Sequence, residues 1–177
     1  MIRRLPFSFA EDNRVVNVLY VCLGNICRSP TAEGVFRRMI EEAGLQAAVR
    51  TDSAGVAPWQ VGRPPDPRAV AAARRRGIEL SCLRARQVAA VDFETFDYLI
   101  AMDRQNLADL RAASPPQRVD RLHLLLAFTA AGAGRDVPDP FYGGADGFEV
   151  VLDLIEDGAR GLFEHIRDRH FAAGGRR

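Results

Sequence analysis

The sequence predicts a single α/β domain of three layers, in which a parallel sheet is covered by helices on both faces. Two observations predict this class. Short apolar runs rich in β-branched residues alternate along the chain with segments of helical periodicity, and such runs are typical of strands buried on both faces. The chain of 177 residues is also long enough for one hydrophobic core, and no internal repeat or linker divides it.

The first predicted unit is a strand, a loop and a helix. Residues 15–21 read Val-Val-Asn-Val-Leu-Tyr-Val and predict a buried strand. After the loop, Ser29 followed by proline is a good helix start, with Ser29 as the N-cap. Glu33 near the first turn suits the helix dipole. Apolar residues at helical spacing then predict a helix over 30–43 that ends near Gly44.

The same alternation continues through the rest of the chain. The further predicted elements are a strand over 48–53, a loop over 58–67, a helix over 68–76, a strand over 96–102, a helix over 104–113, a strand over 121–128, a loop over 132–147 and an amphipathic helix with apolar positions from 148 to 166. We expect the folded domain to cover residues 15–171. A loose N-terminal arm over 1–14 and a frayed tail over 172–177 are expected outside it.

Composition and charge exclude several classes of protein. The net charge of +1 gives no basis for a general nucleic-acid or membrane partner. All 24 basic residues are arginine, so lysine-dependent chemistry is excluded. Three cysteines are too few for a disulfide scaffold, and neither a signal sequence nor a spanning segment is visible, so a cytoplasmic location is expected. The three histidines are dispersed without ligand spacing, so no metal site is expected.

The loop between the first strand and the first helix carries residues suited to chemistry. Cys22 ends the strand and Arg28 lies six positions later. A loop of this length can curl so that its backbone N–H groups point inward, and the following helix adds free N–H groups and the positive end of its dipole. Such a cradle binds an anion and stabilises a Cys22 thiolate, while Arg28 can hold two oxygens of a tetrahedral anion. A thiolate beneath a bound phosphate can attack phosphorus and form a cysteinyl phosphate.

Asp139, between two prolines in a late loop, is the candidate general acid. An alkoxide or phenolate leaves poorly unless it is protonated as it departs. The loop lies beyond the carboxyl end of a predicted strand, where ligand sites of open α/β sheets gather. The two prolines would hold the aspartate stiffly.

The stretch Cys22-Leu23-Gly24-Asn25-Ile26-Cys27-Arg28-Ser29-Pro30 resembles the signature loop of the low-molecular-weight protein tyrosine phosphatases. Further segments similar to that family follow in its order, among them Ser53-Ala54-Gly55, Asp66-Pro67-Arg68, Ala101-Met102-Asp103 and Asp139-Pro140-Phe141. The resemblance covers about residues 15–165. It implies a four-stranded parallel sheet flanked by helices, a phosphate-binding loop after the first strand, and neither a metal nor another cofactor.

The resemblance also implies the roles of three catalytic residues. Cys22 is the nucleophile, and Arg28 binds phosphate and stabilises the transition state. Asp139 is the general acid and then the base that activates water in the second step. All three are present in this chain.

Supporting residues are implied in the same way. Asn25 would hold a left-handed turn of the loop, for which asparagine is well suited. Ser29 would donate a hydrogen bond to the Cys22 thiolate, and Ser53 would brace Asn25. The remaining positions implied in the loop or in the walls of the cleft are Leu23, Gly24, Ile26, Cys27, Trp59, Phe141 and Tyr142.

Two sequence features concern the other thiols and the rigidity of the loop. The family often has a histidine shortly before Ala-Arg-Gln, but this chain has Ser81-Cys82-Leu83-Arg84 there, so that brace is missing. Cys27 can pack passively in the loop or form a disulfide with Cys22 on oxidation, and both interpretations stay open. Cys82 is expected to be a passive, partly buried thiol.

The expected function is hydrolysis of phosphotyrosine or other aryl phosphate monoesters through a cysteinyl phosphate. The substrate would be a phosphotyrosine protein or a small aryl phosphate, and a cognate tyrosine kinase is a candidate partner. One alternative is arsenate reductase on the same fold, which needs further cysteines, and no partner for Cys82 follows it. A second is a phosphoarginine phosphatase, whose loop carries threonine where this chain has the apolar Ile26. A third is a non-catalytic phosphate-binding module, marked by loss of Cys22, Arg28 or Asp139.

Overall fold

The computed structural model describes residues 14–130 and 134–171, and its centre is one parallel sheet. The strands lie in the order β2-β1-β3-β4, and every neighbouring pair is parallel. The predicted fold class is therefore confirmed, with the first strand at an inner position of the sheet. The strands are β1 (Val16–Cys22), β2 (Val49–Gly55), β3 (Tyr98–Ala101) and β4 (Leu122–Leu124).

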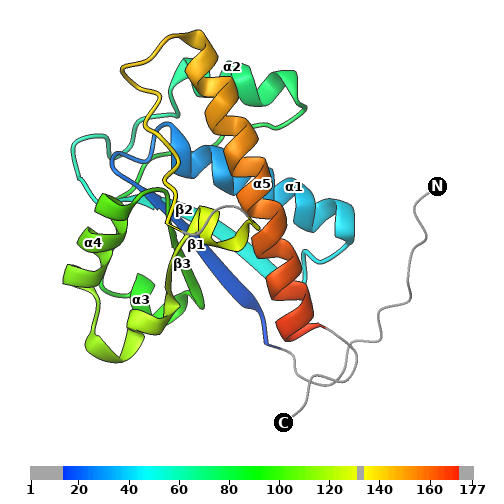
Figure 1. The fold of residues 1–177 in the computed structure, drawn as a ribbon, viewed down its shortest axis with the longest axis vertical. Helices are drawn as coiled ribbons and strands as arrows, with labels where there is room; N and C mark the ends of the chain where they lie inside the picture. The colour runs from blue at the N-terminus through cyan, green and yellow to red at the C-terminus, as the bar shows by residue number, and fades with distance from the viewer. Residues whose placement is uncertain (1–13, 131–133, 172–177) are drawn as a thin grey trace.

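Helices cover both faces of this sheet (Figure 1). Alternate residues of β1 point to opposite faces, as the pleat requires. Val18 and Tyr20 pack in the core on the side of three helices, whereas Leu19 and Val21 pack on the side of two. The first side holds α1 (Arg28–Ala43), α2 (Pro67–Arg75) and α5 (Ala145–His170), and the second holds α3 (Asp92–Thr95) and α4 (Arg104–Ala113).

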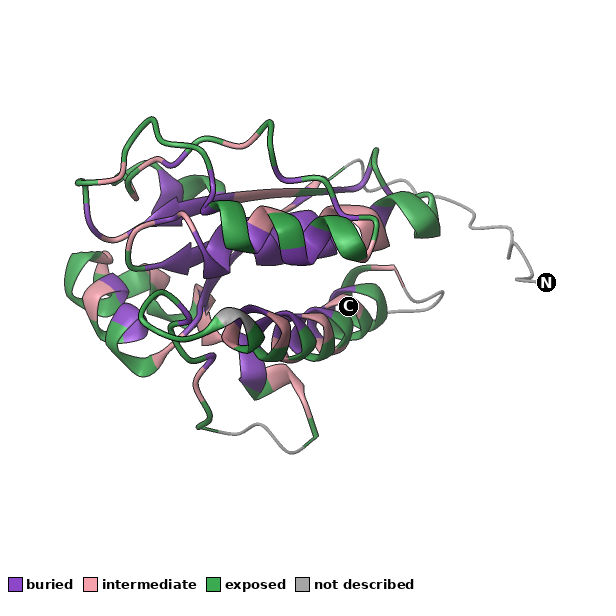
Figure 2. Cartoon of the chain, turned by 90° about the horizontal axis from the view of Figure 1, so that it is seen from above, coloured by how far each residue is buried: buried purple, intermediate pink, exposed green. Residues whose placement is uncertain are grey.

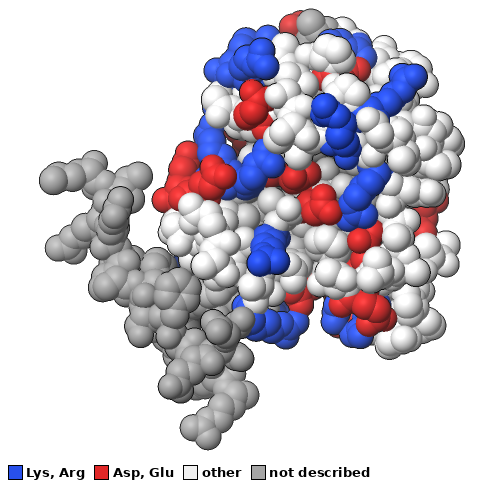
Figure 3. All heavy atoms as spheres, turned by 180° about the vertical axis from the view of Figure 1, so that it is seen from behind, with Lys and Arg blue, Asp and Glu red and all other residues white. Residues whose placement is uncertain are grey.

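Burial and charge follow this layered arrangement. Buried residues concentrate in the strands and on the inward sides of the helices (Figure 2). On the face shown in Figure 3, arginines and carboxylates lie interspersed over the surface. Within the described residues, no helix is long and apolar enough to cross a membrane.

Several predicted boundaries differ from the structure. The strand predicted over 121–128 is only β4, because β3 offers no partner beyond Ala101; the chain continues as the 3₁₀ helix η2 (Leu125–Phe128). A second 3₁₀ helix, η1 (Pro116–Arg121), precedes β4. The first helix begins at Arg28 with Cys27 at its N-cap, so Ser29 is not the cap. The last helix begins at 145 instead of 148.

The ends of the chain lie largely outside the described residues. Of the predicted arm over 1–14, the structure describes only Arg14, which forms an ion pair with Asp97. The predicted tail over 172–177 is outside the described residues altogether. The domain boundaries therefore stay predictions.

The three histidines, dispersed in the sequence, lie together in the fold. Their rings surround Tyr98, with centroid separations of 6.0 Å for His123, 5.8 Å for His165 and 5.9 Å for His170. The Tyr98 hydroxyl also lies 2.9 Å from Nε2 of His170. Burial lowers the pKa of each histidine, and the charge of Arg169 lowers it further. The cluster joins β3, β4 and α5 at the amino end of β3.

Candidate active site

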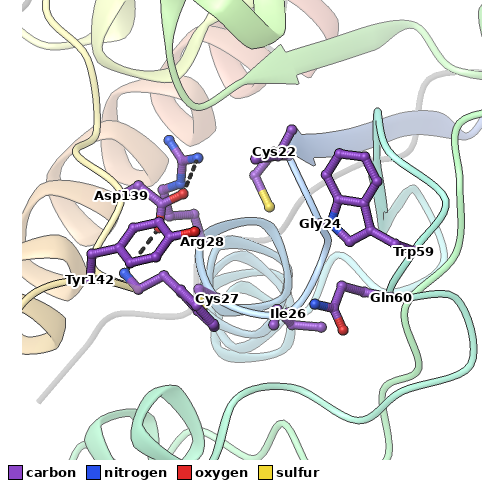
Figure 4. A pocket seen from close by; sticks show the side chains of 11 residues that line it. Cys22, Gly24, Ile26, Cys27, Arg28, Trp59, Gln60, Asp139 and Tyr142 are labelled. Carbon is purple, nitrogen blue, oxygen red and sulfur yellow. Dashed lines mark hydrogen bonds and ion pairs between the residues drawn. The ribbon is translucent and has the colours of Figure 1, made fainter.

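The candidate site lies where β1 ends and α1 begins. Cys22 is the last residue of β1, and residues 23–27 form a tight loop that leads directly into α1 (Figure 4). Here the carboxyl end of a central parallel strand meets the amino end of a helix, the arrangement that favours anions. A pocket of about 140 Å³ opens above the loop and is lined by Cys22, Leu23, Gly24, Ile26, Cys27, Arg28, Trp59, Gln60, Asp139, Phe141 and Tyr142.

Asn25 sets the shape of this loop. It is buried and has a φ of 56°, the left-handed conformation that the resemblance implied. Its backbone N–H donates to Cys22 Sγ across 3.3 Å. Its side-chain Nδ2 donates to the hydroxyls of Ser29 and Ser53, each across 2.9 Å, and its Oδ1 accepts from the Arg86 backbone N–H across 2.9 Å. The backbone N–H and both polar atoms of the side chain of Asn25 are therefore used to hold the loop.

Ser29 links the same network to the thiol. Its Oγ lies 3.0 Å from Cys22 Sγ and is completely buried. Asn25 Nδ2 donates to the Ser29 hydroxyl, and that hydroxyl lies within hydrogen-bond distance of both Cys22 Sγ and the Ala54 carbonyl oxygen, the latter at 3.2 Å. The residue that the sequence placed at a helix cap therefore contacts the thiol.

Glu33 lies behind Ser53 and is not in the first turn of α1, where the dipole argument had placed it, because the helix begins at Arg28. It is 6% exposed, and its Oε2 accepts from Ser53 Oγ across 2.7 Å. Burial raises the pKa of Glu33, and the hydrogen bond from Ser53 partly opposes that shift. A chain of hydrogen bonds thus runs from Glu33 through Ser53 and Asn25 to the loop.

Gly55, at the end of β2, makes room for the loop. A Cβ built there would lie 2.8 Å from the carbonyl oxygen of Leu23 and 3.1 Å from the backbone nitrogen of Asn25. Both atoms belong to the loop backbone, which cannot move aside as a flexible side chain can. The absence of a side chain at Gly55 therefore allows the loop to pack against the sheet.

Arg28 is buried beside the pocket and is held by oxygens of other loops. Its Nη1 donates to Asp103 Oδ2 across 2.5 Å and to the Val137 carbonyl across 3.0 Å, and its Nη2 donates to Asp139 Oδ2 across 3.1 Å. Burial by itself lowers the pKa of Arg28. The charges of Cys22, Asp139 and Asp103 outweigh that effect, and the pKa is raised. The guanidinium is therefore a fixed cation at the edge of the cradle.

Asp139 faces this guanidinium from the loop before α5 (Figure 4). Its Oδ1 accepts from the backbone N–H of Phe141 across 3.0 Å, which orients the carboxyl group from its own loop. The side chain is 37% exposed, so it reaches both the pocket and solvent. The structure thus brings Cys22, Arg28 and Asp139 to one pocket, although 111 positions separate the last two.

Aromatic side chains form the mouth of the pocket. Trp59 is 67% exposed, Phe141 38% and Tyr142 93%, and the rings of Phe141 and Tyr142 meet edge to face at 5.0 Å. Exposed aromatic residues on this scale are rarely left at random on a surface. They offer flat apolar area beside the anion cradle, together with Leu23 and Ile26.

The other two cysteines differ in environment. Cys27 is buried and lines the pocket; burial, followed by the charge of Asp66, raises the pKa of its thiol to about 12. Cys82 is exposed and does not line the pocket, so the expectation of a partly buried thiol is wrong. It lies in the irregular segment between α2 and α3, where no packed element covers it.

The structure places two residues in the site that the sequence analysis did not predict there. Asp103 caps α4 through the Asn106 N–H and binds Arg28, and Gln60 lines the pocket. Asp103 could have been found, because it follows β3 just as Cys22 ends β1, and such strand ends meet at one edge. No sequence pattern of this kind points to Gln60. Among the described residues, no group of three or more histidines, cysteines or carboxylates is arranged to hold a metal ion.

The arrangement defines a class of site. A thiol lies at the base of a curled loop, a buried arginine stands at its edge, and a carboxyl group faces the pocket. Such a site can bind a tetrahedral oxyanion and present a nucleophile to its central atom.

Comparisons with known proteins agree with this class. The family model for low molecular weight phosphotyrosine protein phosphatases matches residues 17–171, and the chain belongs to that family. It is 40% identical over 153 residues to the low molecular weight protein-tyrosine-phosphatase YfkJ of Bacillus subtilis, covering 86% of this chain and 97% of that protein. A Schizosaccharomyces pombe low molecular weight phosphotyrosine protein phosphatase is 45% identical over 143 residues, covering 80% of this chain and 91% of that one. The crystal structure of YfkJ superposes with a TM-score of 0.85 at 38% identity, covering 90% of this chain and 99% of that chain.

Proposed function

We propose that this protein hydrolyses phosphotyrosine and related aryl phosphate monoesters, with Cys22 as the nucleophile. The observation that carries the proposal is the position of Cys22 Sγ, which receives the Asn25 N–H and lies 3.0 Å from Ser29 Oγ. The Asn25 N–H and the Ser29 hydroxyl hold the sulfur at the base of the cradle, beneath the place of a bound phosphate. Family membership supports the same reading.

The first chemical step transfers the phosphoryl group to sulfur. The Cys22 thiolate attacks phosphorus, an Sγ–P bond forms and the P–O bond to the aryl group breaks. Arg28 and the loop N–H groups hold the phosphoryl oxygens as charge develops on them. Asp139 donates its proton to the departing phenolate oxygen. A phosphate that engages Arg28 takes over the donor now used by Asp139, which frees that carboxyl for the leaving oxygen.

The second step returns the enzyme to its starting state. The Asp139 carboxylate accepts a proton from water, and the water oxygen attacks phosphorus in line with sulfur. The Sγ–P bond breaks, inorganic phosphate leaves, and the Cys22 thiolate is restored. Ser29 stabilises that thiolate in its role as leaving group. No metal ion enters either step.

The walls of the pocket support an aromatic ester as substrate. Trp59 and Tyr142 expose flat apolar surface beside the cradle, which suits a phenyl ring. Ile26 in the loop adds an apolar side chain where a guanidinium substrate would need a polar partner. The pocket is small compared with ligand sites of about 300–1,000 Å³, so it takes a phosphate with one ring and leaves the rest of a protein substrate outside.

The proposal extends to a partner and a place in the cell. A tyrosine kinase must supply the phosphotyrosine that this reaction consumes. The thiolate of Cys22 must stay reduced to act as a nucleophile, which favours the cytoplasm.

The test is a panel of substrates offered to the reduced protein. It contains 4-nitrophenyl phosphate, a phosphotyrosine peptide, a phosphoserine peptide, phosphoarginine and arsenate. We expect rapid phosphate release from the first two and little from phosphoserine or phosphoarginine. Reduction of arsenate with a thiol donor would favour the reductase, preferred hydrolysis of phosphoarginine would favour that branch, and phosphate binding without any turnover would favour a binding module.

A further inference from the structure

Arg68, in the first turn of α2, lies outside the pocket but contacts the loop that carries Asp139. Its Nη1 and Nη2 both donate to the carbonyl oxygen of Phe141, each across 3.3 Å. The guanidinium also lies over two aromatic rings, 5.5 Å from the centroid of Phe141 and 4.7 Å from that of Phe148. These contacts fix the residue two positions after Asp139.

The same arginine is anchored to the phosphate loop through Asp66. Its Nε and Nη2 donate to the two carboxylate oxygens of Asp66, across 3.0 Å and 2.9 Å. This two-pronged geometry requires an arginine, since a lysine offers only a single charged nitrogen. Asp66 is nearly buried, and its backbone N–H donates to the Ile26 carbonyl across 2.7 Å. Arg68 therefore contacts the Asp139 loop directly and reaches the phosphate loop through Asp66.

We infer that Arg68 is a positioning residue that sets the place of the Asp139 carboxyl group above the phosphate loop. Phe141 is the connection, because its N–H donates to Asp139 Oδ1 while its carbonyl accepts from Arg68. Arg68 does not line the pocket, so it acts through the loop and not on the phosphate. The inference rests on the proposed function, because it assigns Arg68 to the proton-transfer step of that reaction.

The position of Asp139 matters for that step because proton transfer depends steeply on distance. A general acid must lie within about 2.6–3.2 Å of the atom that it protonates, and a misplacement of about 1 Å can reduce the rate on the order of 10²-fold. If the Phe141 carbonyl loses its donor, the loop relaxes and the carboxyl group moves away from the leaving oxygen. The resulting loss of activity should be larger for esters whose leaving group needs protonation more.

The experiment compares Arg68→Met with the unchanged protein on two esters of different leaving-group strength. We expect kcat/KM to fall about tenfold for phenyl phosphate and less than about threefold for 4-nitrophenyl phosphate. Inhibition by vanadate should stay within about twofold, because Arg68 reaches the phosphate loop only through Asp66, whose backbone N–H can still donate to the Ile26 carbonyl in the variant. Arg68→Lys keeps the positive charge but not the two-pronged hydrogen bonding. Its kcat/KM for phenyl phosphate should therefore lie between the values of the unchanged protein and of Arg68→Met.

Two further variants decide the interpretation. In the Asp139→Asn background, Arg68→Met should cost nothing more, since the acid that it positions is already removed. Arg74→Met in the same helix is the matched control, because Arg74 is exposed and, among the residues that the structure describes, pairs only with Glu79 at 3.8 Å. Equal losses on both esters, or an undiminished loss in the Asp139→Asn background, would overturn the inference. If the unchanged protein hydrolyses neither ester, the proposed function itself fails.

Discussion

Nη2 of Arg28 donates to Oδ2 of Asp139 across 3.1 Å, and this contact joins the start of α1 to the loop before α5. The arginine that would bind phosphate and the carboxyl group that would protonate the leaving group are thus neighbours. A phosphate that binds Arg28 competes with Asp139 for the same donor. Binding and proton delivery are coupled through this one pair.

The role of Asp139 can be tested by changing the leaving group. Asp139→Asn should reduce turnover of phenyl phosphate on the order of 10²–10⁴-fold, because the phenolate then departs without a proton. The loss should be smaller for 4-nitrophenyl phosphate, whose leaving group needs less protonation. Asp146→Asn, at an exposed position in the first turn of α5, should match the unchanged protein on both esters. Equal losses for Asp139→Asn on the two esters would mean that Asp139 only shapes its loop.

Gly55→Ala tests the packing of the phosphate loop against the sheet. The new Cβ would meet backbone atoms of Leu23 and Asn25, so the loop must shift or the strand must move. We expect a loss of stability of about 1–3 kcal/mol, together with weaker vanadate inhibition and a lower kcat/KM. The control is Gly147→Ala, whose Cβ would meet only Pro140 at 3.8 Å. Vanadate affinity unchanged in Gly55→Ala would show that the cradle does not depend on this close approach.

The sequence predicted the sheet, the order of the main elements and the loop at the end of β1, because these depend on local periodicity and one contiguous motif. The meeting of Cys22, Arg28 and Asp139 was predictable only through the family resemblance and the rule that strand ends share an edge. Glu33 shows where local reasoning failed. The dipole argument placed it near the first turn of the helix, whereas that turn holds no acidic residue and Glu33 is buried beneath Ser53.

Local reasoning also missed the grouping of the three histidines. Their spacing in the sequence gave no sign of a cluster, since Tyr98 brings them together from β4 and from the end of α5. Arg68 is a third case. Its contacts join two loops that are distant in the sequence. The segment Asp66-Pro67-Arg68 was part of the family resemblance, but it gave no sign of this link.

Oxidation tests the part played by Cys27. Peroxide converts the Cys22 thiolate to a sulfenic acid, and the Cys27 thiol can displace water from it to give a disulfide. The pKa of Cys27 is raised to about 12, so Cys27 stays protonated and Cys22 is the thiol oxidised first. Peroxide should therefore inactivate the protein, dithiothreitol should restore it, and phosphate should slow the loss. Cys27→Ser should be inactivated without full recovery.

Peptide mapping provides the control for that experiment. It should find Cys22 joined to Cys27, and Cys82→Ser should recover like the unchanged protein because Cys82 is exposed outside the pocket. A Cys22–Cys82 disulfide, or full recovery of Cys27→Ser, would refute the pairing. The first of these results would also favour the reductase reading.

The histidine cluster predicts how stability depends on pH. The pKa of His123 is lowered in the folded state from its ordinary value of 6.5, so the unfolded chain binds more protons near that pH. The free energy of unfolding should therefore fall as pH drops through about 6.5, and this contribution is fully present above it. His123→Phe keeps an aromatic ring beside Tyr98 and removes the titratable group at position 123. Thermal unfolding between pH 5.5 and 7.5 should then show a shallower slope for the variant, and an equal slope would contradict the assignment.

In the proposed mechanism, Cys22 carries the phosphoryl group between the two steps. The direct measurement is acid quenching of the protein during turnover of a phosphotyrosine peptide, followed by mass spectrometry of its peptides. We predict one phosphoryl adduct on the peptide that contains Cys22. In Cys22→Ser, both the adduct and turnover should disappear while vanadate still binds to the loop. An adduct on another residue, or appreciable turnover by Cys22→Ser, would contradict the mechanism.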